Sequence, residues 1–70
     1  MTEKSFTFGK FKEIIKKLMT ASEKHDGLAL QNLEVEIINT YQATTMNSQE
    51  YRVLIDMCDI MLDDWRRNNK

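Results

Sequence analysis

The chain has no proline, two glycines and one cysteine among its 70 residues. A single cysteine excludes a disulfide within the chain, and one cysteine with one histidine is too few for a structural zinc site. Apolar runs reach only three residues, which is too short for a membrane span or for the apolar core of a signal peptide. We therefore expect a cytoplasmic protein with no membrane contact, no cofactor and no metal site.

The chain also has no large excess of positive or negative charge. Ten lysines and arginines stand against eleven acidic residues, for a net charge of −1 at pH 7. Such a chain has no large field to attract nucleic acid. At 70 residues it forms one domain, residues 1–70, which buries only about 60% of the surface of its unfolded chain. We do not expect a lid, a second lobe or a deep substrate pocket.

What is present is helical patterning. Apolar residues recur at helical spacing in three stretches and predict helices over about 8–25, 28–44 and 48–67. Short connections between them predict an all-α fold, a small three-helix antiparallel bundle in which the third helix is the longest. The side chains expected to face the core are Phe8, Phe11, Ile14, Ile15, Leu18 and Met19, then Leu30, Leu33, Ile37, Ile38 and Tyr41, then Tyr51, Leu54, Ile55, Cys58, Met61, Leu62 and Trp65.

The predicted helices carry recognisable start and stop signals. Thr7 is expected to cap the first helix, with Phe6 and Phe11 at the positions of a hydrophobic staple. Gly27 is expected to end that helix, because glycine adopts the left-handed conformation without a Cβ clash. Asn47 and Glu50 have the spacing of a capping box at the start of the third helix.

The third helix is predicted to be apolar on two sides. Val53, Met57 and Ile60 lie well away from its core-facing stripe. Either the first two helices grip opposite flanks of this helix and cover the second stripe, or the stripe is a surface for a partner. The partner reading predicts a binding site whose members are Val53, Met57, Ile60, Asp56, Asp64, Trp65 and Arg67.

This second stripe favours a non-enzymatic, protein-binding module that acts as a regulator, inhibitor or adaptor. The expected partner is another protein or a second copy of the chain, with a homodimer favoured over a monomer. In composition the chain is similar to many small accessory proteins of bacteria and phages, and that similarity carries no residue over.

A nucleic-acid-associated factor is the alternative reading, because six lysines lie in or before the first helix. The first 27 residues sum to +2, while the remainder sums to −3. The lysines are Lys4, Lys10, Lys12, Lys16, Lys17 and Lys24. They spread around the polar arc of the helix instead of forming a tight stripe, which favours an ordinary solvated surface.

A metal-dependent enzyme subunit is the third reading, because Asp56, Asp59 and Asp63 share one side of the third helix. Arg52 and Arg67 stand four residues from Asp56 and Asp63, so ion pairs explain much of this charge.

Three other residues have ordinary structural explanations. Cys58 is expected to pack as a small buried hydrophobe, and His25 to sit at the end of the first helix. Glu34, on the border of an apolar stripe, is expected to reach solvent or to pair with a lysine or with His25.

Overall fold

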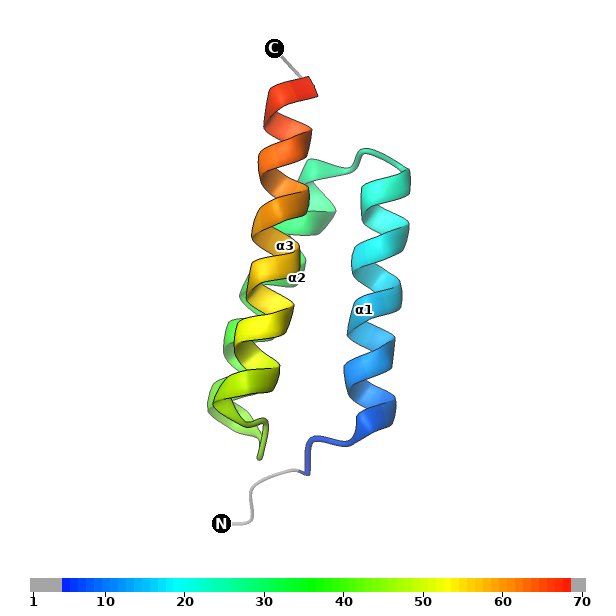
Figure 1. The fold of residues 1–70 in the computed structure, drawn as a ribbon. Helices are drawn as coiled ribbons and strands as arrows, with labels where there is room; N and C mark the ends of the chain where they lie inside the picture. Colours follow the sequence, from blue (N-terminus) through cyan, green and yellow to red (C-terminus); the bar gives the residue numbers. More distant parts are fainter. Residues whose placement is uncertain (1–4, 69–70) are drawn as a thin grey trace.

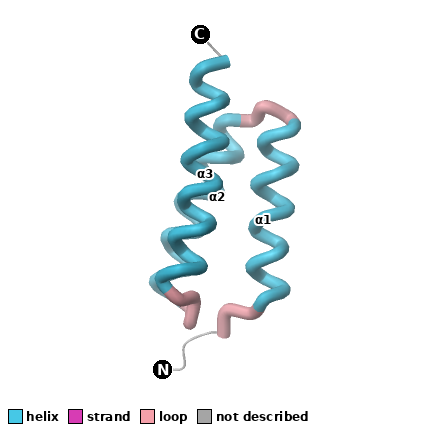
Figure 2. The backbone as a smooth tube through the Cα atoms, in the orientation of Figure 1, coloured by secondary structure: helices cyan, strands magenta, loops and turns pink. Residues whose placement is uncertain are grey.

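Three helices make up the part of the chain that the structure, a computed structural model, describes: residues 5–68. They are α1 (Phe8–Glu23), α2 (Gly27–Ala43) and α3 (Ser48–Asn68), and α3 is the longest at 21 residues. Short loops join them, and no strand occurs in these residues (Figure 2). The predicted all-α three-helix bundle is therefore confirmed, although the first predicted helix was two residues too long at its C-terminal end.

The three helices alternate in direction along an elongated bundle of 46 × 18 × 17 Å. α1 and α3 both begin at the same end and run in the same direction, while α2 runs back between them in sequence (Figure 1). α3 packs most extensively against α2 and least against α1. The contact between α1 and α3 is therefore the least extensive of the three contacts between helices.

The start of α1 follows the signals in the sequence. Thr7 accepts a hydrogen bond from the backbone N–H of Lys10 at 3.2 Å, as an N-cap residue does. The rings of Phe6 and Phe11 meet edge to face with their centroids 6.4 Å apart. This contact is the predicted hydrophobic staple, which fixes the direction in which the chain enters the helix.

The start of α3 also follows its signals. The side chain of Asn47 accepts from the N–H of Glu50 at 2.8 Å, and the side chain of Glu50 accepts from the N–H of Asn47 at 3.1 Å. These two bonds form a complete capping box and satisfy two amides that have no partner within the helix. Met46, just before the cap, is buried in the core.

The turn between α1 and α2 differs from the prediction. The residue in the left-handed region is His25, with φ 52°, and not Gly27. The N–H of His25 donates to the carbonyl of Ser22, and Asp26 caps α2 by accepting from the N–H of Ala29 at 3.1 Å. Gly27 is already the first residue of α2. Gly27 makes room for Trp65, because the indole ring of Trp65 occupies the position that a side chain on residue 27 would need.

The core lies between all three helices. Its buried residues are Ile14, Leu18, Ala21, Leu30, Leu33, Ile37, Met46, Leu54, Cys58 and Leu62. Cys58 is fully buried, and its thiol donates a hydrogen bond to the carbonyl of Leu30 at 3.2 Å. The rings of Tyr41 and Tyr51 are stacked with their centroids 4.3 Å apart. They extend the contact between α2 and α3 to the end of the bundle at which α3 begins.

Candidate protein-binding face

The second apolar stripe of α3 is only partly covered. Met57 is half-buried and packs against the core, whereas Val53 is 47% exposed and Ile60 is 69% exposed. Neighbouring helices do grip both flanks of α3, but they leave these two side chains in solvent. The structure therefore divides the stripe that the sequence predicted into one packed residue and two uncovered ones.

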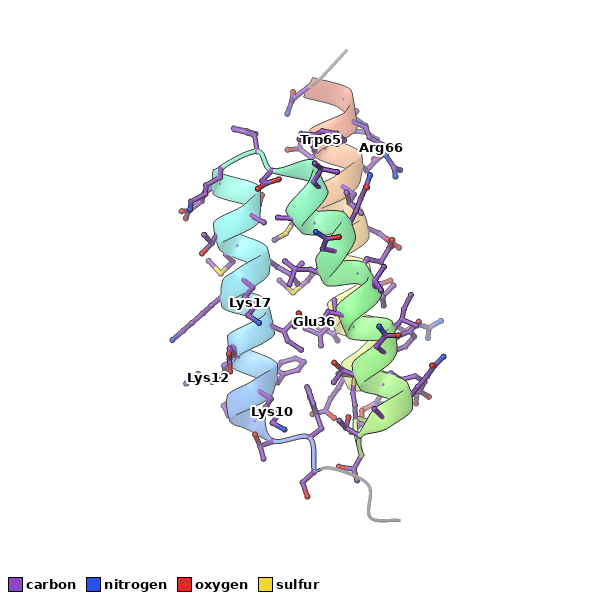
Figure 3. All side chains as sticks on the ribbon, turned by 180° about the vertical axis from the view of Figure 1, so that it is seen from behind. Lys10, Lys12, Lys17, Glu36, Trp65 and Arg66 are labelled. Atoms are coloured by element: carbon purple, nitrogen blue, oxygen red, sulfur yellow. The ribbon has the colours of Figure 1, made fainter. Side chains whose placement is uncertain are left out.

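α1 adds two further apolar side chains to the surface. Phe8 is 71% exposed and Met19 is 50% exposed, so the prediction that both belong to the core is wrong. At about 100° per residue, both lie half a turn around α1 from Lys17. Lys17 reaches Glu36 of α2 at 3.5 Å, so it marks the α2 side of α1 (Figure 3). Phe8 and Met19 consequently lie on the side of α1 that is turned away from α2.

Charged residues also identify the flank of α3 that contacts α2. Glu34 of α2 lies beside Asp59 and Arg66, which place α2 on one flank of α3. At about 100° per residue, Val53 lies about a third of a turn from Asp59 and farther than that from Arg66. Ile60 follows Val53 after two turns, and it lines a cavity with Glu34, Asp59 and Arg66. Val53 therefore points away from α2, whereas Ile60 lies beside Val53 on the side of α3 that is nearer to Glu34. We define the α1–α3 face by the exposed apolar side chains that point away from α2, which are Phe8, Met19 and Val53, with Ile60 at its outer edge.

Charged side chains surround this face. On α1, the ammonium of Lys12 lies over the ring of Phe8, 5.6 Å from its centroid. Asp56 and Asp64 are exposed on α3, as the sequence predicted for a rim. Charges of both signs therefore border the face on each helix, since Glu23 follows Met19 by one turn on α1 and Arg67 is exposed on α3.

The remaining predicted site residues lie towards the C-terminal end of α3. Arg67 is exposed and pairs with Asp63 at 2.9 Å, which confirms that local ion pair. Arg52 and Asp56, both in the described part, form no such pair. Trp65 is half-buried and packs on Gly27 at the end of the bundle, apart from the four exposed apolar residues.

Glu34 is held differently from the prediction. Its carboxyl group approaches neither a lysine nor His25 but Asp59 of α3. A hydrogen bond to Asp59 and partial burial raise the pKa of Glu34 above its ordinary value, and the charge of Arg66 opposes this increase. The carboxyl group of Glu34 therefore holds a proton at a higher pH than it would in solvent.

The aspartate row does not gather into a cation site. Asp59 faces Glu34 and Asp63 pairs with Arg67. In residues 5–68, no group of three or more potential metal-ligating side chains lies close enough together to hold an ion. Cys58 is equally constrained, because burial and the nearby Glu34 and Asp59 carboxylates raise the pKa of its thiol to about 11. The thiol is therefore protonated at neutral pH.

Sequence reasoning missed Phe8 and Met19 as members of a surface. A signal was available, because the apolar stripe of the first helix is wider than one packing contact needs, and these two residues form its edge.

No helix in the described part of the chain is both long and apolar enough to span a membrane. Comparison of the chain with models of known protein families, with curated protein sequences and with solved structures finds no match.

Proposed function

We propose that the chain is a non-enzymatic protein-binding module, a regulator, inhibitor or adaptor that docks its partner on the α1–α3 face. One observation carries this proposal: Phe8, Met19, Val53 and Ile60 are all large, apolar and about half or more exposed. The first three point away from α2, and Ile60 lies beside Val53 at the outer edge of the same face. Contiguous apolar surface with a polar rim is characteristic of protein interaction sites.

The energy available on this face supports binding. Burying a large aliphatic or aromatic side chain completely is worth about 1.5–3 kcal/mol, so four partly exposed ones supply several kcal/mol. Phe8 is suited to act as an anchor, since aromatic side chains dominate the energetics of interfaces. Asp56, Asp64 and Arg67 lie at the rim, where charges set the register and the rate of association more than the affinity.

The reducing cytoplasm is the proposed location. Cys58, the one cysteine, is a buried free thiol that contributes to packing and to a hydrogen bond with Leu30. Proteins of oxidising compartments at this size usually depend on disulfides, which one cysteine cannot provide.

Nucleic acid is the less supported partner. Among the described lysines, Lys17 is engaged by Glu36, and Lys12 lies over the ring of Phe8. Lys10 reaches the carbonyl of Ser5 at 3.4 Å. A nucleic-acid complex would lose affinity steeply between about 50 and 200 mM salt, which gives a simple way to separate the two proposals.

Site-specific photo-crosslinking in the cell of origin tests the proposed function. A photoreactive amino acid at position 60 probes the α1–α3 face, and one at the exposed position 31 on α2 is the control. We expect a discrete adduct only from position 60, and we expect Phe8→Glu in the same chain to abolish it. Identical adducts from both positions, or none from position 60, would refute the proposal.

A further inference from the structure

We propose that the groove between α1 and α2 is a second docking site, which takes an acidic amphipathic helix from a partner protein. The groove has a volume of about 500 Å³ and lies on the side of α1 that carries Lys17 (Figure 3). Phe8 and Met19 lie half a turn around α1 from Lys17, so this α1–α2 groove and the α1–α3 face are separate surfaces. The inference therefore goes beyond the proposed function and does not depend on it.

The floor of the α1–α2 groove is apolar. Ala21 and Leu33 are buried, Ala29 is half-buried, and all three line the groove. Because α1 and α2 each contribute an alanine here, the floor leaves space that longer side chains would fill. A leucine on the contact side of a partner helix can bury its apolar surface in that space. Such apolar anchors supply most of the affinity when an amphipathic helix docks into a groove.

Lysines stand along the α1 edge of the same groove. Lys16, Lys17 and Lys24 all line it, and all three are exposed. Lys24 is the C-cap of α1 and keeps a helical backbone, with φ −84° and ψ −1°. Lys17 and Lys24 are seven residues apart, so they lie on one side of α1 about 10 Å from each other along the axis. Two carboxylates seven residues apart on a partner helix match this spacing, with an apolar residue between them above the floor.

The carboxylates near the groove leave these ammonium groups available. Asp26 lines the groove, but its side chain accepts the N–H of Ala29 at 3.1 Å as the cap of α2. Glu13 lines the groove one turn before Lys17, at the end that lies away from the turn between the helices. Glu36 pairs with Lys17 at 3.5 Å, with both side chains about half exposed. An exposed pair of this kind is weak, so a partner carboxylate can replace it.

The charge of α1 selects an acidic partner over a basic one. Residues 8–24 contain five lysines and two glutamates, so this edge of the groove is positive. Nucleic acid fits the groove less well, because neither an arginine nor an aromatic side chain of residues 5–68 lines it. A chain with docking sites on two sides of α1 suits the adaptor among the roles proposed above.

NMR titration with a synthetic helix tests the inference. The probe is an alanine-based peptide of about 15 residues with one leucine between two glutamates placed seven residues apart. Its control has glutamines at the two glutamate positions. We expect saturable shifts of the amide signals of Ala21, Ala29 and Leu33, with a dissociation constant below about 1 mM. The control peptide should bind at least about fivefold more weakly, and added salt should weaken only the acidic peptide.

Three lysine variants identify the contacts. Lys17→Gln and Lys24→Gln should each weaken binding of the acidic peptide about threefold, and together about tenfold. Lys10→Gln is the matched control, because Lys10 is an exposed lysine of α1 that does not line the groove, and it should bind as the wild type does. Circular dichroism checks that every variant stays folded.

The inference is overturned if about 1 mM acidic peptide shifts no signal, if the shifts map outside the groove, or if Lys10→Gln weakens binding as much as Lys24→Gln. Shifts of the same amides on concentrating the chain alone would make a second copy the occupant and would equally overturn it. A groove that binds no peptide in a chain that still gives the discrete crosslink from position 60 would refute this inference and retain the proposed function.

Discussion

The indole ring of Trp65 lies so close to Gly27 that a Cβ atom on Gly27 would clash with the ring carbons. Trp65 belongs to the last turns of α3, and Gly27 is the first residue of α2. The contact therefore fastens the C-terminal part of α3 to the turn that joins α1 and α2. It also explains why a glycine stands at a helical position where its backbone needs no left-handed conformation.

Gly27→Ala is expected to destabilise the bundle. The added methyl group must displace the Trp65 ring, and overpacking of this kind costs about 1–3 kcal/mol, which exceeds the gain of about 1 kcal/mol in helix propensity. Gly9→Ala is the matched control, because only Thr7 Oγ1 lies near its added Cβ, at 3.7 Å. Thermal unfolding should show a lower Tm for Gly27→Ala and an unchanged or higher Tm for Gly9→Ala. Equal stabilities would contradict the contact.

The capping box at Asn47 and Glu50 gives a second prediction. Asn47→Ala removes the acceptor for the Glu50 N–H and should lower the free energy of unfolding by about 1 kcal/mol. Asn47→Ser keeps an oxygen at the cap and should retain most of that stability. Urea denaturation measures both. Equal losses for the alanine and serine variants would show that the cap bond contributes nothing.

The Glu34–Asp59 contact predicts a pH dependence. The pKa of Glu34 is raised in the folded chain, so its stabilising contribution is present below the ordinary carboxyl pKa and is lost as the pH rises through the higher value. Glu34→Gln should therefore gain stability relative to wild type at pH 7, by about 0.5 kcal/mol for a solvent-screened pair, and lose that advantage near pH 4.

Glu36→Gln is the control for this measurement, because Glu36 faces Lys17 instead of another carboxylate. It should show no gain at pH 7. Urea denaturation at both pH values decides the matter, and a Glu34→Gln variant no more stable than wild type at pH 7 would disprove carboxylate repulsion at this contact.

Cys58 is expected to be unreactive in the folded protein. Its side chain is fully buried and its pKa is about 11, so very little thiolate is present or accessible at pH 7.5. Labelling by a thiol reagent should be slow in buffer and should accelerate by orders of magnitude in denaturing urea. Rapid labelling without denaturant would show that this region of the core opens readily.

Local signals were readable from the sequence, whereas contacts between distant residues were not. The Thr7 and Asn47 caps depend only on neighbours three residues away, and both were predicted correctly. The role of Gly27 depends on Trp65, which is 38 positions away and reaches it only after the bundle closes. His25 was missed as the left-handed residue because a nearby glycine was the stronger signal for that conformation.

The candidate face was likewise predictable only where local spacing sufficed. Helical spacing was enough to single out Val53 and Ile60 on α3, and both are exposed. Phe8 and Met19 share the broad apolar stripe of the first helix with Leu18, which is fully buried. Only the placement of α2 and α3 around α1 determines which part of that stripe is covered.

Two valines provide the most direct test of the α1–α3 face. Val53 lies on the face and is 47% exposed, while Val35 lies on α2, outside the face, and is 55% exposed. Glutamate at either position should leave the helical bundle folded, as judged by circular dichroism and thermal unfolding. Photo-crosslinking from position 60 then compares Val53→Glu and Val35→Glu with the otherwise unchanged chain. We expect the adduct from position 60 to persist with Val35→Glu and to be lost with Val53→Glu, while both variants stay folded; equal adduct yields from the two variants would contradict the account.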